Sequence, residues 1–469
     1  MQTKTISRIF ALLSVAFLLV ATAHAKKSTV STGDFHALVI DAGSKGTRLL
    51  VFRFDAQSLN RTDELTHATV VAVHATRPGL SFFGLTPEKV QPLLHGLVDK
   101  AKESLRHLQS YWSTFPIYLK GTAGLRDLIP LRRDAVMYNV EQVLSESGFW
   151  FKKRMSTVIS GEQEAAFGWL ALNLQRGSLS HHGRDSLGIL DLGGASLQVG
   201  FVPLKGHYVL EHFVPMEIDK NNPVDLYAKS YLHYGLVEAN RRVDALIISN
   251  ALLTVESIRE IDNPCFNAGM NYTPDFAGDR YVIPIHTVML GSGSFADCQQ
   301  LLEQLMSKRA PCWVRECTFD GVYQPRLDDR KFIGISTFSR IVEDLNLPAN
   351  TTTPADIKQA GIKVCSTPYT ELSSSYESVK LPNRDNLCFT AVYVYTVLTH
   401  GLGFHEDTKQ ITFYKSPKKY PEQIVDWALG AAVWEMNRLP PGGLAEFLAK
   451  IKSTSRQSAS EQLNEGVVA

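Results

Sequence analysis

Two aspartates, Asp41 and Asp191, each stand at the end of an apolar run that continues into a loop containing glycine. The two segments read LVIDAGSKGTRLLVF and GILDLGGASLQVGF. Each pattern predicts a buried strand, a tight turn whose backbone N–H groups can point at an anion, and a second strand. The same hairpin used twice predicts a nucleotide phosphate site between two homologous half-domains that face each other.

The two loops supply candidate ligands for a polyphosphate chain and for a metal ion. Glycine allows the backbone to approach a phosphate closely because it has no Cβ, and Lys45 adds a positive charge. The predicted phosphate contacts are Ser44, Lys45, Gly46 and Thr47 in the first loop, and Gly193, Gly194, Ala195 and Ser196 in the second. Asp41 and Asp191 are hard oxygen donors suited to Mg²⁺ or Ca²⁺. For either aspartate alone, a turn or cap role is the alternative, and their pairing favours the metal.

A carboxylate and two polar side chains are candidates for the activation of water. Glu164 opens a predicted helix directly after the Ser160-Gly161 turn, so its carboxylate can enter a cleft and act as general base. Glu162 is the competing residue, although a glutamate in the first helical turn can simply complement the helix dipole. Ser196 and Gln198 alternate on one strand face and could orient the attacking water. A polar face exposed to solvent is the alternative for these two.

Three further positions have candidate roles in substrate binding. Thr122 and Ala123 follow a third predicted strand and are expected to contact phosphate. Arg126, one turn later, could stabilise charge on the terminal phosphate or pair with a carboxylate in the cleft. Tyr393 could stack on the nucleobase, with packing in the core as the alternative.

Composition and the first residues limit the class of protein. The chain has 469 residues, 44% of them hydrophobic, and a formal net charge of +1, which argues against a nucleic-acid scaffold. Lys4 and Arg8 precede the apolar run from Phe10 to Ala21, and small residues end at Ala25. We expect residues 1–25 to be a signal peptide, because the run is shorter than the roughly 20 residues of a membrane span. An uncleaved membrane anchor is the alternative. The mature protein is expected to be secreted or periplasmic, without a stable membrane anchor, and monomeric.

All six cysteines lie in the second half of the chain and indicate disulfides of an oxidising compartment. Six cysteines permit 15 pairings. We favour pairs of neighbours, namely Cys265 with Cys298, Cys312 with Cys317, and Cys365 with Cys388. A zinc site is the alternative, but the cysteines show no CxxC pair and no histidine at ligand spacing.

The order of strand and helix patterns predicts an α/β protein with two domains. Residues 34–160 alternate strands and helices, including an amphipathic helix from Gln91 to Leu108. Residues 161–426 form the second, larger domain with the disulfide-rich insertions, and a helix after Asp426 is predicted to return to the first domain with residues 427–469. Four strand ends carry polar glycine loops, and ligands of open α/β sheets gather at such ends.

Five segments in this order resemble the apyrase conserved regions of the nucleoside triphosphate diphosphohydrolases. They are Asp41-Ala-Gly-Ser-Lys-Gly-Thr-Arg48, Thr122-Ala-Gly-Leu-Arg126, Ser160-Gly-Glu-Gln-Glu-Ala-Ala-Phe-Gly-Trp169, Asp191-Leu-Gly-Gly-Ala-Ser-Leu-Gln198 and Asp426-Trp-Ala-Leu-Gly430. The resemblance implies two RNase H-like domains of the actin, hexokinase and Hsp70 type, with the active site in the cleft between them. It also implies Glu164 as the catalytic base and a metal held by Asp41 and Asp191 through water.

The resemblance implies hydrolysis of the terminal phosphates of nucleoside tri- and diphosphates to the monophosphate. Water would attack directly, and the partners would be these nucleotides. Three rival functions share the phosphate loops. An exopolyphosphatase would lack a pocket for a base, a sugar kinase would transfer phosphate to a hydroxyl, and a nucleotide-binding module would hydrolyse only incidentally.

Overall fold

The computed structural model describes most of the chain between residues 34 and 438. The described residues are 34–55, 68–179, 183–204, 210–217, 223–253, 259–274, 276, 287–308, 310–314, 317–327, 330–414 and 426–438. The predicted signal peptide lies outside these ranges. Among the described residues, no helix has the length and apolar character needed to cross a bilayer.

The first sheet has the strand order β3-β2-β1-β4-β5. Its strands are β1 (Asp34–Ala42), β2 (Thr47–Asp55), β3 (Ala68–Thr76), β4 (Ile117–Gly121) and β5 (Ser156–Val158). The first three strands form an antiparallel meander, and β4 and β5 add to β1 in parallel. Alternate side chains point to opposite faces, so Leu38 and Ile40 pack under helices α3 and α5, whereas Ala37 and Val39 face the centre of the molecule.

Helices α3 (Val90–Ser104) and α5 (Pro130–Glu146) cover the outer face of this sheet. The helix predicted from Gln91 to Leu108 ends earlier, because the chain turns into the 3-10 segment η3 (Arg106–Thr114). Short helical segments connect the other elements of this region. They are η1 (Leu80–Phe83), η2 (Pro87–Lys89), α4 (Ala123–Arg126) and η4 (Lys153–Met155).

The second sheet has the order β14-β13-β6-β7-β9-β8. Its strands are β6 (Gly188–Leu192), β7 (Ser196–Phe201), β8 (Phe213–Glu217), β9 (Pro223–Leu232), β13 (Phe332–Ser336) and β14 (Ile411–Phe413). Its first hairpin repeats that of the first sheet. Asp191 pairs with Gln198 across β6 and β7, as Asp41 pairs with Arg48 across β1 and β2.

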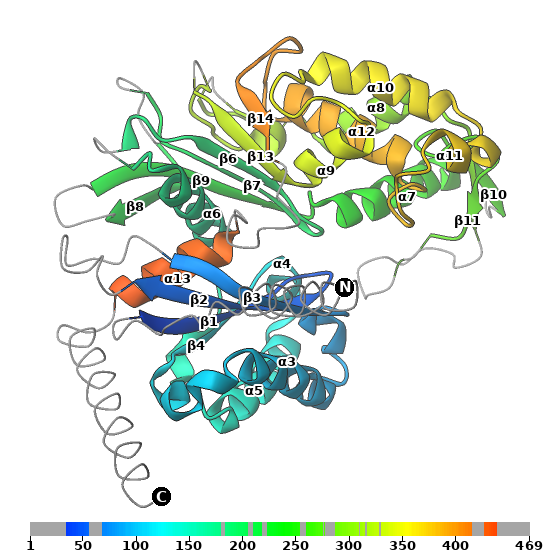
Figure 1. Ribbon diagram of the computed structural model, residues 1–469. Coiled ribbons are helices and arrows are strands. Elements are labelled where there is room, and N and C mark those ends of the chain that lie inside the picture. Colours follow the sequence, from blue (N-terminus) through cyan, green and yellow to red (C-terminus); the bar gives the residue numbers. More distant parts are fainter. Residues whose placement is uncertain are drawn as a thin grey trace, which may run out of the picture.

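Two helices lie between the sheets, as Figure 1 shows. They are α6 (Gly161–Arg176), which begins at a capping box formed by Ser160 and Gln163, and α13 (Trp427–Asn437). From α6, Phe167 packs toward the first sheet and Trp169 toward the second. A Cβ on Gly430 of α13 would lie 2.0 Å from the carbonyl oxygen of Phe167, so glycine permits this close packing of the two helices.

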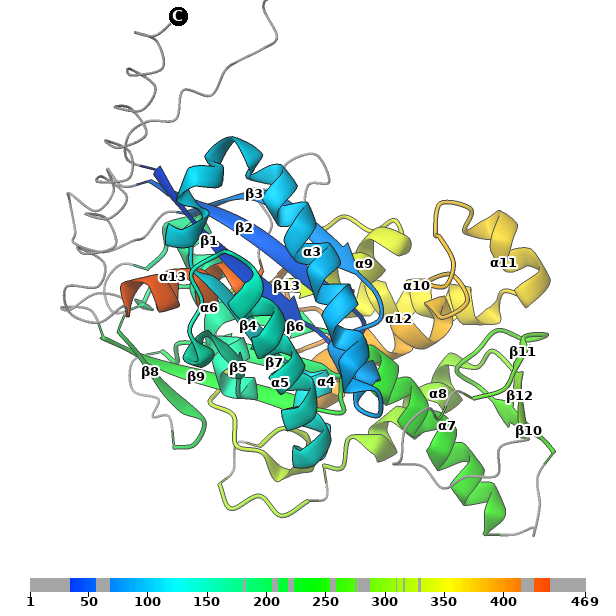
Figure 2. The same cartoon turned by 90° about the horizontal axis from the view of Figure 1, so that it is seen from below.

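The outer face of the second sheet is covered by a helical layer, and a small sheet lies at the far end of that layer (Figures 1 and 2). The helices are α7 (Leu236–Leu252), α8 (Phe295–Leu305), α9 (Thr337–Asp344), α10 (Pro354–Ser366), α11 (Tyr369–Ser375), α12 (Leu387–Thr396), the 3-10 turn η6 (Phe319–Gly321) and the π turn η7 (Val397–Gly401). The small sheet contains β10 (Glu260–Asn263), β11 (Asn271–Tyr272) and β12 (Val288–Gly291). The described elements therefore stack as helices, sheet, two helices, sheet and helices.

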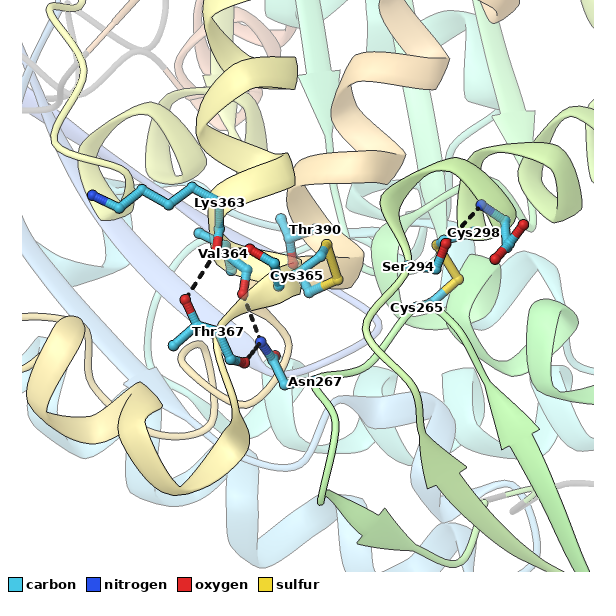
Figure 3. The surroundings of a disulfide bond; sticks show 12 residues. Cys265, Asn267, Ser294, Cys298, Lys363, Val364, Cys365, Thr367 and Thr390 are labelled. Carbon is cyan, nitrogen blue, oxygen red and sulfur yellow. Dashed lines mark hydrogen bonds between the residues drawn. A yellow bond between two sulfur atoms is a disulfide. The ribbon is translucent and has the colours of Figure 1, made fainter.

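Three disulfides join neighbouring cysteines and confirm the predicted pairing. They are Cys265–Cys298, Cys312–Cys317 and Cys365–Cys388. Figure 3 shows two of them on either side of Asn267, whose amide nitrogen donates to the carbonyl oxygens of Val364 and Thr367. The first bridge ties a turn to the helix that contains Cys298, and the third joins the two helices that contain Cys365 and Cys388.

The predicted α/β architecture on two sheets is confirmed. We call the first sheet with α3, α4 and α5 the first lobe, and the second sheet with its outer helices the second lobe. The boundaries at residues 160 and 426 stay predictions, because α6 and α13 both pack against the two sheets. The rest of the predicted return segment, residues 439–469, lies outside the described residues.

Candidate active site

The two glycine loops meet at the cleft between the lobes. A Cβ on Gly194 would lie 2.7 Å from Cε of Lys45 and 2.9 Å from Oγ of Ser44. One cavity of about 880 Å³ is lined by Asp41, Gly43, Ser44, Lys45 and Gly46 from the first loop and by Asp191, Gly193, Gly194, Ala195 and Ser196 from the second. The predicted convergence of both hairpins on one cleft is therefore present in the structure.

The strand order gives this cleft two different flanks. In the first lobe, β4 and β5 lie on one side of β1 and Asp41, and β3 lies on the other. In the second lobe, β7 and β9 lie on one side of β6 and Asp191, and β13 and β14 lie on the other. Residues that follow β5, or that belong to β7, therefore line one flank, which we call the water flank. Those that follow β3, β13 and β14 line the opposite one, which we call the exit flank.

Three aspartates and one arginine line the floor of the cleft, namely Asp41, Asp191, Asp426 and Arg48. Arg48 donates to Oδ2 of Asp41 at 2.5 Å and lies 2.7 Å from Oδ2 of Asp426. The other carboxylate oxygen of Asp426 accepts from the backbone N–H of Ala428, so Asp426 caps the start of α13. Arg48 thus ties α13 to the first hairpin.

Burial is the main cause of the raised pKa values of Asp41 and Asp191, the two candidate metal ligands. It raises the pKa of Asp41 to about 6, against the opposing effect of Arg48, with Asp426 and Asp191 adding to the rise. Burial also raises the pKa of Asp191 to about 6, and a hydrogen bond with Ser336 opposes it. Both carboxylates are thus destabilised as anions. A cation in the cleft would relieve this cost.

The donors fit a hydrated divalent cation better than a fully liganded one. Oδ1 of Asp41 is buried and has no hydrogen-bond partner. Within the described residues, no group of three or more His, Cys, Asp or Glu side chains could enclose a metal ion. Mg²⁺ commonly keeps several waters and binds one or two carboxylates plus phosphate oxygens. Asp41 and Asp191 are suited to that mode.

Glu164 lies on the water flank at the start of α6. Its side chain is almost fully buried, and Arg126 donates to its Oε2 at 2.8 Å and to the carbonyl oxygen of Ile159 at 3.2 Å. Burial raises the pKa of Glu164 to about 7, although Arg126 opposes the rise. Glu162 is more exposed and lies 4.0 Å from Lys229. Of the two glutamates, only Glu164 lines the cleft.

A hydrogen-bonded row of polar side chains faces Glu164 from the second lobe. Nε2 of Gln198 donates to Oγ of Ser196 at 2.6 Å and to Oγ of Ser230 at 2.8 Å. A Cβ on Gly161 would lie 2.3 Å from Cβ of Ser230, so this glycine lets the start of α6 approach β9. The row leaves the amide oxygen of Gln198 and the serine hydroxyl groups as polar contacts for water.

Comparison with known proteins decides the family. Residues 28–452 match the GDA1/CD39 (nucleoside phosphatase) family. The chain belongs to this family. Its members hydrolyse phosphoric anhydrides, and this chain is a hydrolase of that kind.

Named relatives match over most of their length. The chain is similar to a Golgi apyrase of Saccharomyces cerevisiae, with 25% identity over 91% of this chain and 74% of that protein. It is also similar to a nucleoside-triphosphatase of Pisum sativum, with 28% identity over 86% and 89% of the two chains. A solved nucleoside triphosphate hydrolase of Neospora caninum shares the fold, with a TM-score of 0.66 and 16% identity over 95% of this chain and 99% of that one. This likeness supports the predicted two-domain, actin-like fold.

Most of the predicted site residues of this nucleoside phosphatase line the cleft, but Tyr393 does not. Its ring is fully buried in the core of the second lobe, where it stacks on Phe389. Its hydroxyl group donates to the carbonyl oxygen of Tyr234 at 2.6 Å. The prediction that Tyr393 stacks on a nucleobase is therefore wrong for this structure. The alternative, packing in the core, is the one present, because every residue of α12 is buried.

Two other predicted residues take positions behind the cleft wall. The side chain of Thr47 is buried at the start of β2 and is absent from the lining of the cavity. Arg126 is also absent from the lining, because it pairs with Glu164, the second of the two roles that its position suggested. Thr122 and Ala123 do line the cavity.

Several residues of the site were missed from the sequence. Arg48, Arg77, Arg340 and Tyr414 line the cavity, as does Ser336, whose φ of 57° places a non-glycine residue in the left-handed region at the end of β13. Ser336 had one usable signal, because it ends the apolar run FIGIS as Asp41 and Asp191 end theirs. Arg48 stands in the first hairpin itself, whereas Arg77, Arg340 and Tyr414 stand outside the predicted motifs. Only the fold brings them to the cleft.

Proposed function

We propose that this protein hydrolyses the terminal phosphoanhydride bond of nucleoside tri- and diphosphates down to the monophosphate. One observation carries the proposal. The buried carboxylate of Glu164, whose pKa is raised to about 7, lines the same cavity as Ser196 and Gln198, at one flank of two phosphate loops that meet. A carboxylate with a pKa near the working pH is a suitable general base.

The polyphosphate would lie between the two loops. Backbone N–H groups of residues 44–47, 194 and 195 would be the donors to its oxygens, whereas the predicted contact from the N–H of Gly193 is not available because it donates to the carbonyl oxygen of Ser196 at 3.0 Å. Glycine at 193 and 194 keeps Cβ atoms out of the way. The terminal phosphate would be at the water flank and the rest of the nucleotide toward the exit flank. This direction follows from the position of Glu164, because the attacking water must stand in line with the leaving oxygen.

Water would be oriented by Ser196 and Gln198 and would lose its proton to the carboxylate of Glu164. Arg126 holds that carboxylate in place and keeps it ionised at neutral pH more readily than burial alone would allow. The new P–O bond forms as the bond to the leaving oxygen breaks. The products are inorganic phosphate and a nucleotide shorter by one phosphate.

The cofactor would be Mg²⁺ or Ca²⁺, held by Asp41 and Asp191 through water. When bound, such an ion neutralises phosphate charge in the transition state. Arg48 keeps Asp41 in position, and Ser336 does the same for Asp191. We further propose secretion or export to the periplasm, for which the apolar run at the start of the chain is the support.

A substrate panel tests the proposal. Purified protein is given ATP, ADP, AMP, GTP, UTP or long-chain polyphosphate, with Mg²⁺, Ca²⁺ or EDTA, and released phosphate is measured. We expect turnover of tri- and diphosphates, none of AMP, and loss of activity in EDTA. The exopolyphosphatase alternative is not favoured, since the named relatives are apyrases and nucleotide phosphatases. If long-chain polyphosphate were hydrolysed faster than any nucleotide, the exopolyphosphatase alternative would be favoured over the nucleotidase.

A further inference from the structure

The exit flank of the cleft carries three positively charged side chains from three separate elements. Lys45 comes from the loop between β1 and β2, Arg77 directly follows β3, and Arg340 lies on α9 of the opposite lobe. All three line the cavity, together with the carboxylate of Glu343. Positively charged side chains thus outnumber negatively charged ones on this flank, and both lobes contribute positively charged side chains.

These cations lack a full set of protein partners. In the ranges that the structure describes, neither Lys45 nor Arg77 forms an ion pair. Nε of Arg340 lies 3.9 Å from Asp344, and its Nη2 donates to Thr337. Burial lowers the pKa of Lys45 to about 8, and the charges of Arg340 and Arg77 lower it further. An anionic ligand would offset this repulsion, which points to phosphate as the missing partner.

Two of the three side chains stand directly against the phosphate loops. The stem of Lys45 crosses to the second loop, where it occupies the space next to Gly194. A Cβ on Gly46 would lie 3.4 Å from Cγ of Arg77, so the stem of Arg77 lies on the first loop. The cations therefore continue the row of backbone donors toward the exit flank, away from Glu164.

We propose that Lys45, Arg77 and Arg340 bind the phosphates of the leaving nucleotide and make the enzyme favour triphosphates over diphosphates. This inference rests on the proposed function, which places the terminal phosphate at the water flank. A nucleoside diphosphate then has one phosphate beyond the bond that breaks, whereas a triphosphate has two. The second of these extends further along the exit flank, where Arg77 and Arg340 stand on opposite lobes.

The double variant Arg77→Ala/Arg340→Ala tests the inference through the ratio of kcat/KM for ATP to that for ADP. We expect kcat/KM for ATP to fall about 100-fold and that for ADP about 10-fold. The ratio then falls about tenfold, equivalent to about 1.4 kcal/mol of lost discrimination. The matched control is Lys89→Ala/Lys363→Ala, which removes one exposed cation from each lobe outside the cleft lining. It should leave the ratio unchanged.

Salt dependence and binding give readouts that do not depend on turnover. The affinity of the wild type for a non-hydrolysable ATP analogue should fall as ionic strength rises, and more steeply than that of the double variant, because ionic contacts are screened. If the double variant is poorly folded by thermal melting, the single variant Arg340→Gln takes its place in the same assays.

The failures of the two proposals are distinguishable. An unchanged ratio of kcat/KM for ATP to that for ADP in a folded variant would overturn the selection of triphosphates by the exit flank, while hydrolysis by the wild type still stands. A wild type that hydrolyses neither nucleotide would instead refute the proposed function itself.

Discussion

Replacing Glu164 by glutamine is the most direct test of the chemistry. The change keeps the volume of the side chain and leaves an amide oxygen that can accept the hydrogen bond from Arg126, whose nitrogen lies 2.8 Å from Oε2. The buried surroundings should therefore stay packed. Only the ability to take a proton from water is lost. General-base catalysis contributes about 10² to 10⁴ in rate, so we expect kcat to fall by that factor with little change in nucleotide affinity.

The raised pKa of Glu164 adds a second signature to this test. With a pKa of about 7, the carboxylate is about one-tenth ionised at pH 6 and about nine-tenths ionised at pH 8. Since the base acts in its ionised form, kcat of the wild type should rise about tenfold over this interval. The residual rate of Glu164→Gln should not follow that rise.

The assay is phosphate release from ATP and ADP at saturating substrate, with binding of a fluorescent nucleotide measured separately. Glu162→Gln is the matched control, because it lies in the same helical turn, carries the same charge, and pairs loosely with Lys229 outside the cleft lining. We expect it to retain most of the activity. A kcat of Glu164→Gln within threefold of the wild type, with binding intact, would refute the general-base assignment, as would an equal loss in the control.

Two further predictions concern the loops and the floor of the cleft. Gly194→Ala should raise KM for both nucleotides about tenfold, because its Cβ would lie 2.7 Å from Cε of Lys45, whereas Gly96→Ala, with no atom within 4 Å, should not change KM. Equal KM values in the two variants would show that the loops do not touch. Since the raised pKa values of Asp41 and Asp191 make their ionised forms costly in the folded state, the melting temperature in EDTA should fall as pH rises from about 4 to about 6. Mg²⁺ should raise the melting temperature more at pH 7.5 than at pH 4, and an equal rise at both would count against metal binding by these aspartates.

The parts of the site that follow from local sequence were predictable. A strand that ends in a polar residue before a glycine turn places that residue at the edge of a sheet, and this rule located Asp41, Asp191 and Thr122. The helix start after Ser160 likewise fixed the position of Glu164 through its capping box. The cysteine pairs were also local, because each bridge closes a short stretch of chain.

The residues that were missed depend on contacts between distant segments. Arg48 lies on β2, where its side chain reaches Asp41 across the hairpin and Asp426 nearly at the other end of the described chain. No periodicity indicates such a pair. Tyr393 was instead assigned to the site although it lies in the core. The apolar pattern of α12 is compatible both with a helix that lines a binding site and with a buried core helix. Only the number of layers packed around α12 separates the two.

The duplicated hairpins alone cannot tell which end of a phosphate chain reacts. Two matching loops on two sheets form a nearly symmetric clamp, and a symmetric clamp would bind the chain in either direction. The direction comes from what differs between the flanks, namely Glu164 with Arg126 on one side and Arg77 with Arg340 on the other. A carboxylate repels phosphate unless water or a cation stands between them, whereas a guanidinium attracts it. On the proposed mechanism, the charged groups around the repeated loops would therefore convert a general polyphosphate clamp into a site that cleaves at one end.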